Sequence, residues 1–548
     1  MLNVRSLSKL NFLRFNVRQY AAGKATSEGT QRYYLDKLQM FAENAITRTP
    51  SVSKRSNWTI GRVGFDSTQV SNNNKNYQVA LQFALQSGCN VVHIDPNNVI
   101  GQELCAVVLN GMIEENVLKR DEIIITSQVG YHEPTGRDSI NIVHFDPTKD
   151  HSIAPSSIKD QLALLKELLH MDTIDILYLT DPEIQYADDD DDATFSNKIE
   201  EAFSYMEQLV QEGQIQRYGI HSRFLPDQSR RKFTLKQYLD VAIKAGGEDH
   251  HFEYISFPYN FVEKQPYQHR AYNGSTDNLF QNAQHYNIST IGHRPLHAIL
   301  PGGKSVKFVD VRVENDTHSF EPTLQDPNQE TALNVFMDSM NETIRYEQTL
   351  PDADDFPTDI AKGENHKLPH IGALRWGMIL SGNLSRLDTL HTFENVLENR
   401  IRPELHYAHE KLRKSQMGKK YSQWLVQYNY LCTKMIRDYT TLLKEKHLFE
   451  VRNAKKHVDE LCPELIGSET MSKKVMRTLL SSGVDCVLTD PRHESQIDDL
   501  VVSIGEHVSE KGVKDLMEKA EWRTINFEES DEPMEGQPRR SLDNDEDL

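Results

Sequence analysis

The chain has 548 residues, a formal net charge of −20 at pH 7 and 38 % hydrophobic residues. The excess of acidic residues argues against general nucleic-acid binding, which needs clustered Lys and Arg to neutralise phosphates. No run of about 18 apolar residues occurs, so the sequence predicts no membrane-spanning helix. The five cysteines are scattered and form no C-x-x-C pair. We therefore expect buried thiols that pack as small hydrophobic groups, with no disulfide framework or zinc site.

Residues 1–27 differ in composition from the rest of the chain. They hold five basic residues, interleaved with Leu and Phe, and the first acidic residue is Glu28. An amphipathic, acid-free N-terminus of this kind is typical of a mitochondrial transit peptide, and Arg18–Tyr20, followed by two alanines, resembles a processing site. We therefore expect a mitochondrial protein, located in the matrix. A basic tail without defined structure is the alternative.

Residues 57–300 alternate between strand-like and helix-like patterns. The clearest step begins with the apolar run Ile174–Glu183, a buried strand, followed by a helix over 199–210. Gly213 ends that helix, and residues 218–220 form the next strand. Strand, helix, glycine and strand in this order make one step of a parallel α/β barrel. The other strands are expected at 58–65, 89–95, 123–127, 254–257 and 288–291, and the other helices at 77–87, 103–115, 156–170, 235–245 and 279–286.

The rest of the chain is longer than a plain barrel needs. Residues 28–56 are predicted to form one helix and a linker. Residues 301–470 are predicted to be an insertion, which is irregular and rich in Asp, Asn and Pro to about residue 365 and helical beyond it. Residues 471–525 complete the barrel, and the acidic stretch 526–548 is predicted to be disordered. The predicted fold is therefore α/β, a (β/α)8 TIM barrel with a large, mostly helical insertion before the last strand.

Two stretches resemble motifs of the aldo/keto reductases. They read IDILYLTDPE at 174–183 and EGQIQRYGIHS at 212–222, and further motifs of that family follow in order through residues 57–300 and 470–502. The resemblance implies a TIM barrel that reduces carbonyl groups with a hydride from NADPH. It also implies that a Tyr protonates the developing alkoxide. A Lys paired with an Asp would lower the pKa of that Tyr, and a His would orient the carbonyl.

The catalytic positions that the resemblance implies have lost most of their chemistry. For the Asp, the Tyr, the Lys and the His, in that order, this chain has Asp95, Ile100, Gln128 and Thr180. A second alignment puts His93 at the Asp position and Asn98 at the Tyr position, so neither alignment supplies the Tyr. Because losing one general acid typically lowers a rate by ~10²–10⁴, we expect little reductase activity by this mechanism.

The positions that the resemblance implies for the nucleotide are also altered. They are held by His221, Ser222, Ser256, Arg294 and Arg492. Arg294 and Arg492 could clamp a phosphate, with ordinary surface arginines as the alternative reading. Asp490 stands where the family has a glycine, and its charge would repel a phosphate. NADP is therefore the cofactor that the resemblance implies, through a site whose binding groups are depleted.

Three histidines, His93, His221 and His293, and Tyr131 lie at or just after predicted strand ends. In a parallel barrel these positions lie at the C-terminal mouth. Histidines there could relay protons or bind a metal ion. Since the sequence shows no metal-ligand spacing, we expect no metal site.

These observations leave three hypotheses for the function. The first is a mitochondrial protein with an aldo/keto-reductase-like barrel that is inactive or very weak as an enzyme and has a binding, structural or regulatory role. Its partner would be an unknown protein or small molecule, with no nucleic acid and no membrane span. The second is a divergent NADP-dependent oxidoreductase that reduces a carbonyl substrate with relocated catalytic groups. The third is a sensor that binds NADP(H) without turnover.

Overall fold

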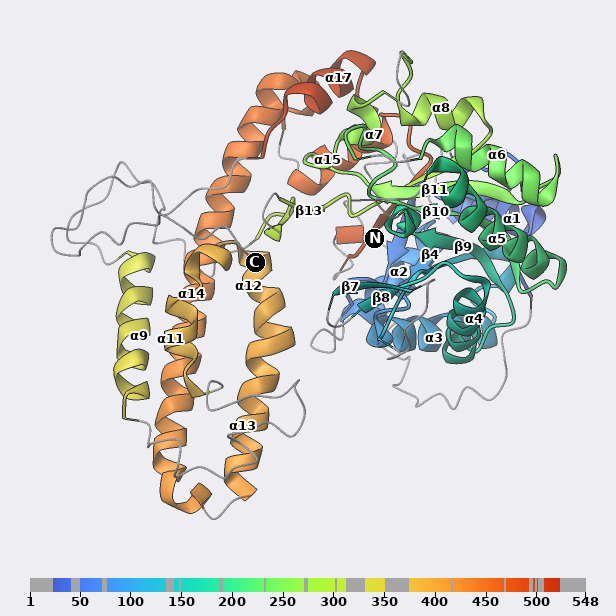
Figure 1. Cartoon of the computed structure of the whole chain (residues 1–548). Helices are drawn as coiled ribbons and strands as arrows, with labels where there is room; N and C mark the ends of the chain where they lie inside the picture. The colour runs from blue at the N-terminus through green and yellow to red at the C-terminus, as the bar shows by residue number, and fades with distance from the viewer. Residues whose placement is uncertain are drawn as a thin grey trace.

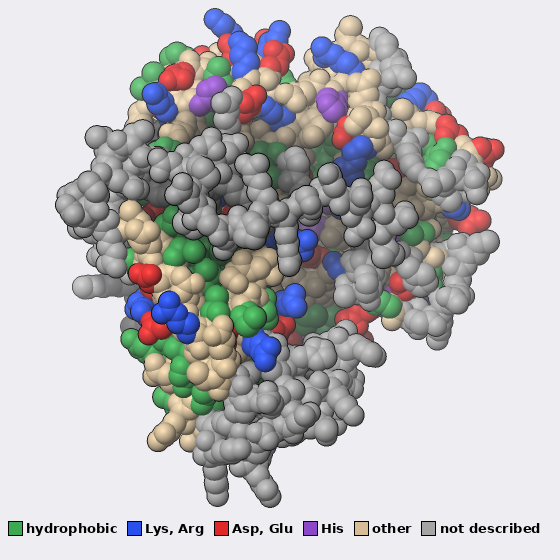
Figure 2. Space-filling view, turned by 60° about the vertical axis from the view of Figure 1, so that its left-hand side comes forward, with side chains coloured by type: hydrophobic (Ala, Val, Ile, Leu, Met, Phe, Trp, Pro, Cys, Tyr) green, Lys and Arg blue, Asp and Glu red, His purple; other side chains and the backbone are tan. Residues whose placement is uncertain are grey.

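The structure is a computed structural model of the whole chain. The residues that it describes are 23–40, 50–70, 76–134, 142–146, 149–186, 191–230, 233–270, 275–300, 303–311, 331–349, 374–414, 417–467, 470–491, 496–497, 500 and 507–522. Two parts are distinct in Figure 1, a barrel and a group of long helices beside it, which we call the helical region. Acidic and basic side chains are intermingled on the described surface in Figure 2, so the net negative charge forms no single patch on this face.

Eight parallel strands form a closed barrel, at the right of Figure 1. In the order in which they pair around the barrel they are β3 (Val63–Asp66), β4 (Val91–Ile94), β5 (Ile124–Val129), β9 (Ile174–Thr180), β10 (Ile215–His221), β11 (Phe252–Pro258), β12 (Ser289–His293) and β15 (Cys486–Thr489). β15 pairs with β3 and closes the ring. β9 and β11 are buried along their whole length, as parallel strands covered on both faces are. The predicted TIM barrel is confirmed.

Helices cover the outside of the barrel. They are α2 (Asn76–Gln86), α3 (Val99–Glu114), α4 (Pro155–Leu169), α5 (Asp192–Gln211), α6 (Leu235–Gly246), α8 (Leu279–His285), α15 (Met471–Leu480) and α17 (Glu510–Lys519). Their limits follow local chemistry. Thr234 and Gln237 form a capping box that begins α6, and Gly247, with φ of 73°, ends it. Gly213 also has a positive φ, of 72°, where the sequence predicts the end of α5.

The N-terminal end of the barrel is closed by a short hairpin and by α1 (Ser27–Met40). The hairpin pairs β1 (Ser51–Val52) with β2 (Thr59–Ile60), so the predicted strand over 58–65 is wrong as one element and is divided into β2 and β3. The break falls at Gly61, where a Cβ would lie 2.6 Å from the carbonyl oxygen of Gly88. Such close backbone contact permits only glycine.

The predicted insertion before the last strand is confirmed, and it forms the helical region. Its helices are α9 (Ala332–Glu347), α11 (Trp376–Ser381), α12 (Leu390–Val396), α13 (Arg402–Lys414) and α14 (Met417–Leu461), with a π-helical turn at Leu397–Ile401. They surround a hydrophobic core of their own, separate from that of the barrel. The prediction of irregular structure to residue 365 is wrong at α9. Thr331 caps this helix, and Phe336 and Met340 bury one face at helical spacing.

The hairpin of β13 (His297–Ile299) and β14 (Ser305–Lys307) joins the two parts. Thr389, which caps α12, donates its hydroxyl hydrogen to the carbonyl of Ser305, at 2.7 Å. The Nζ of Lys304 lies 2.9 Å from the Oδ2 of Asp388, and the carbonyl of Asp388 accepts a hydrogen bond from Lys446 on α14. The helical region is thus attached to the barrel through polar contacts.

Several other predictions concern the chain as a whole. All five cysteines are buried and unpaired, as predicted. Within the described ranges, none of the helices is long and apolar enough to span a membrane. Residues 1–22 of the predicted transit peptide and the acidic tail at 526–548 lie outside the described residues.

Candidate functional site

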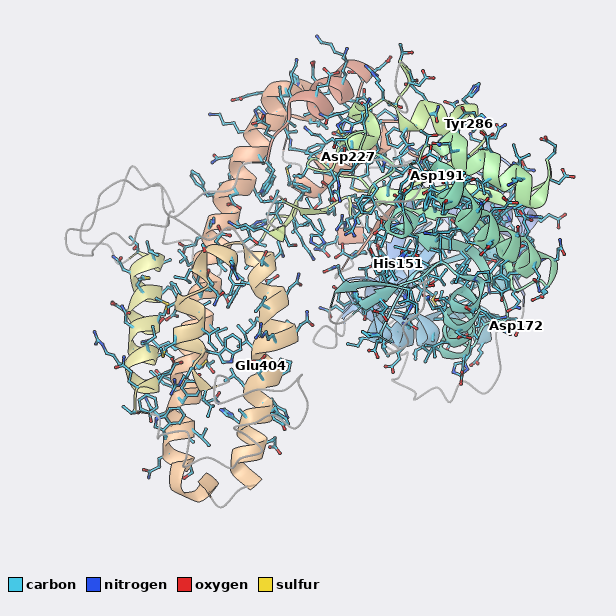
Figure 3. All side chains as sticks on the ribbon, viewed as in Figure 1. His151, Asp172, Asp191, Asp227, Tyr286 and Glu404 are labelled. Atoms are coloured by element: carbon cyan, nitrogen blue, oxygen red, sulfur yellow. The ribbon has the colours of Figure 1, made fainter. Side chains whose placement is uncertain are left out.

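The C-terminal ends of the barrel strands meet on the side of the barrel that faces the helical region. Figure 3 shows His151 on this side, at the end of β8 (Lys149–His151), and Asp172, just before β9, at the far edge. β8 lies between β6 (Tyr131–His132) and β7 (Val143–Asp146) in a small antiparallel sheet. In TIM barrels this end carries the functional site.

Two of the four predicted catalytic positions are brought together there. Asp95 directly follows β4, and Gln128 lies on the neighbouring strand β5, with its Nε2 donating to the Oδ1 of Asp95 at 3.5 Å. The same oxygen accepts a stronger hydrogen bond from the backbone N–H of Asn97, at 2.9 Å. Burial raises the pKa of Asp95, which is 8 % exposed. A neutral amide therefore occupies the place of the ammonium that the resemblance implies beside this carboxylate.

Ile100 and Thr180, the other two predicted positions, offer no proton donor of the required kind. Ile100 lies in the first turn of α3 and packs against the core of the barrel. Thr180 ends β9, and its buried Oγ1 has no hydrogen-bond partner among the described residues. Asn98, from the second alignment, caps α3 and donates to the carbonyls of Ser67, Thr68 and Val70. The role of Asn98 here is therefore structural.

The predicted nucleotide positions are engaged with other protein groups. The hydroxyl of Ser222 donates to the Oε1 of Glu183 at 2.8 Å. The Nδ1 of His221 lies 3.1 Å from the Oγ of Ser256. Arg294 pairs with Glu263, with a nitrogen–oxygen distance of 2.6 Å.

Arg492 lies outside the described residues. Asp490, beside it in the sequence, is 3.3 Å from the Nζ of Lys307. An anionic dinucleotide needs free cationic and N–H groups, and the described positions have these groups already paired. The residues present therefore do not fit NADP in the way that the resemblance implies.

A cluster of histidines around one carboxylate lies at the same end of the barrel. The ring of His293 packs edge to face against His93 and His221, with ring centres 4.7 and 4.6 Å apart. The Nδ1 of His293 is 3.1 Å from the Oδ2 of Asp66, and that of His93 is 2.9 Å from the Oγ1 of Thr126. The expectation that these histidines lie near the mouth agrees with this arrangement.

The histidine cluster shifts the ionisation of its own members. Burial, and then the proximity of His293, lowers the pKa of His93 to about 3. Burial and the other imidazoles likewise lower the pKa of His221. Burial alone would raise the pKa of Asp66, but its hydrogen bond to His293 and the nearby His93 hold that pKa well below its usual range. Sequence reasoning missed Asp66, although a charged residue at the end of the buried strand β3 is a usable signal.

Tyr131 lies in a second polar group at this end. Its hydroxyl donates to the Oδ2 of Asp181 at 3.0 Å and accepts from a guanidinium nitrogen of Arg223 at 3.1 Å. Burial and then Asp181 raise the pKa of Tyr131. This phenol is therefore held in its neutral form, as a weaker acid than a free tyrosine.

Comparison with known proteins gives one family and two solved structures. The Aldo/keto reductase family model matches residues 58–376. The aldo-keto reductase AKR11C1 from Bacillus halodurans (holo form) is 13 % identical, with 88 % of this chain and 98 % of that chain covered and a TM-score of 0.42. The glycerol dehydrogenase AKR11B4 from Gluconobacter oxydans is 12 % identical, with coverages of 87 % and 98 % and a TM-score of 0.42. No curated protein matches the chain.

Proposed function

Because the chain belongs to the aldo/keto reductase family, we propose that it keeps the barrel of this family without its reductase activity. It would then serve a binding, structural or regulatory function, with a protein or a small molecule as its partner. The observation that carries the proposal is the Asp95–Gln128 contact, in which an amide stands where the family's chemistry needs a positive charge. The family generally binds NADP(H), and we propose that this chain binds it weakly or not at all.

The chemistry of carbonyl reduction supports this proposal. Transfer of a hydride to a carbonyl carbon leaves a negative oxygen, which must take up a proton from a nearby acid. The side chain of Ile100 has no proton to give, and the Gln128 amide has no charge with which to lower a neighbour's pKa. With each lost acid or base worth ~10²–10⁴ in rate, turnover by the family's mechanism would fall below detection.

Tyr131 supports a second candidate function, a divergent reductase with a relocated proton donor. Its hydroxyl lies beside the cationic Arg223, which is the kind of neighbour that such a donor needs. However, the pKa of Tyr131 is raised by burial and by Asp181, whereas an efficient donor has its pKa lowered towards the working pH. We therefore rank this candidate second.

The test uses the purified full chain. NADPH is titrated by calorimetry, and NADPH oxidation is followed with a panel of aldehydes and ketones. We expect no binding at micromolar concentrations and no oxidation above background. Micromolar binding without turnover would support the sensor hypothesis instead. Turnover that is lost in Tyr131→Phe, and kept in the control Tyr286→Phe at the end of α8, would support the divergent reductase.

We also propose that the chain is imported into the mitochondrial matrix and cleaved before Ala25. The composition of the N-terminus supports import. The N–H of Ala25 donates to Asp175 at 2.8 Å, and its carbonyl accepts from Gln216 at 3.0 Å, so removal through residue 27 would break buried contacts. N-terminal sequencing of the protein from isolated mitochondria tests this limit. A mature chain that starts after Ala25, or a full-length chain in the cytosol, would contradict the proposal.

A further inference from the structure

We propose that Asp66, His93 and His293 form a binding site for a divalent first-row transition-metal ion, such as Zn²⁺, at the C-terminal mouth of the barrel. This inference does not depend on the proposed absence of reductase activity. It concerns residues outside the predicted catalytic and nucleotide positions, with His93 entering only in the second alignment.

The topology of the barrel creates the cluster from residues far apart in the sequence. Asp66 ends β3 and is directly paired in register with His93 on β4. His293 ends β12, and only the short strand β15 separates β12 from β3. One potential ligand atom from each of the three residues lies within 4.8 Å of the other two.

The donor set fits a particular class of ion. Two imidazoles and one carboxylate suit Zn²⁺, Co²⁺ and Fe²⁺, whereas Mg²⁺ and Ca²⁺ prefer sites made of oxygen alone. Around a four-coordinate Zn²⁺ with Zn–N bonds near 2.0–2.1 Å, neighbouring ligand atoms are on the order of 3.3 Å apart. The three side chains would have to close by no more than about 1.5 Å, which modest side-chain rotation provides.

A second observation points to a missing partner in the same place. The Nε2 of His293 is buried and has no hydrogen-bond partner among the described residues, and the residue is only 4 % exposed. A buried polar atom without a partner is costly, and a metal bond would satisfy it. The hydroxyl of Thr126 holds the ring of His93 through its Nδ1, as groups behind metal-binding histidines do.

His221 supplies a route to the cluster. This residue is partly exposed, whereas the three proposed ligand residues are buried, and its ring contacts that of His293. An ion could therefore enter past His221 without unfolding the barrel.

The first experiment uses the full chain after removal of metal with a chelator. Equilibrium dialysis against Zn²⁺ should give one ion per chain at micromolar or lower free concentration, with no competition from an excess of Mg²⁺. Co²⁺ should give visible absorption bands and two strongly shifted imidazole N–H proton resonances. It should give no thiolate charge-transfer band, because the five cysteines lie outside the proposed site.

The second experiment uses variants. Asp66→Asn and His93→Gln should each lower the affinity for Zn²⁺ by more than about 100-fold, since even groups behind the ligands contribute 10–100-fold. The control His285→Gln removes an exposed histidine on α8 and should bind as the unaltered chain does. Zn²⁺ should raise the Tm of the unaltered chain and of the control only.

Two results would overturn the inference. One is an unaltered chain that binds no Zn²⁺ and gives no Co²⁺ bands, and the other is a pair of site variants that bind Zn²⁺ as tightly as the control. Either would make the cluster a hydrogen-bonded part of the barrel core. If the variants fail to fold, the Co²⁺ spectra of the unaltered chain decide alone, since they need no substitution.

Discussion

The barrel and the helical region bury their charged side chains for different purposes. In the helical region the buried carboxylate of Glu347 accepts hydrogen bonds from the N–H groups of Gly377 and Met378 and so caps the start of α11. The barrel also has a buried carboxylate of this structural kind, Asp175, near its N-terminal end. Its C-terminal mouth gathers Asp66, Asp95 and several histidines that hold no helix end. The comparison teaches that the titratable groups left over from structural work lie at the mouth.

The largest effect that sharpens this comparison is expected from Asp175→Asn. Asp175 is fully buried, pairs with Arg120 at 2.9 Å, and accepts a hydrogen bond from the N–H of Ile125 at 2.7 Å. Breaking a buried ion pair on one side leaves an uncompensated charge and typically costs about 3–5 kcal/mol. Denaturant unfolding measures the loss. Asp172→Asn, an exposed neighbour in the sequence, is the control and should have little effect.

The helical region has its own core, and Leu443→Ala on α14 tests whether that core unfolds independently. Leu443 is fully buried, and truncation of a buried leucine costs about 2–5 kcal/mol. We expect a separate, earlier unfolding transition, followed by far-UV circular dichroism, while the transition of the barrel stays in place. A single transition that moves as a whole would show that the two cores are coupled. Val426→Ala, at an exposed position on the same helix, is the matched control.

Glu183 gives the barrel a pH dependence that the helical region should not share. Burial, and then Asp181, raises its pKa from 4.5 to about 7. Because the folded state holds this proton more tightly than the unfolded state, stability is greatest below about pH 4.5 and falls as the pH rises to about 7, by roughly 3 kcal/mol in total.

The variant Glu183→Gln should remove this fall from the barrel transition, measured by denaturant unfolding between pH 5 and 7.5. Glu201→Gln, at an exposed position on α5, should keep it. An unchanged slope in Glu183→Gln would mean that Glu183 titrates near its ordinary pKa.

The smallest expected effect compares one helix cap from each region. Thr234 caps α6 on the barrel, and Thr331 caps α9 in the helical region. Replacing either threonine by alanine should cost about 1 kcal/mol, since the first turn loses one hydrogen bond. Thr234→Ala should move only the barrel transition and Thr331→Ala only the transition of the helical region. Equal shifts of both transitions in either variant would argue against two cooperative units.

The two regions also differed in how well the sequence predicted them. The barrel strands and helices could be predicted because each is a local pattern, such as the apolar run of β9 and the glycine stop after α5. α9 was missed because its polar surroundings outweighed Phe336 and Met340, whose partners on α14 are far away in the sequence. The same limit applies to the site.

Substitutions at the family's motifs were readable, but the cluster of Asp66, His93 and His293 was not. No spacing along the chain brings these three residues together, and only the closure of the barrel does so. The roles of the predicted catalytic and nucleotide residues stay predictions.

The position of the insertion has a consequence for synthesis of the protein. β12 ends at His293 and its neighbour β15 begins at Cys486, so the seven earlier strands emerge from the ribosome long before the strand that seals them. At roughly 5–20 residues per second, the gap lasts about 10–40 s. During that interval the nascent sheet exposes two unpaired edges, β12 and β3, which invite pairing with other chains. We therefore expect the growing polypeptide to engage chaperones until its eighth strand arrives.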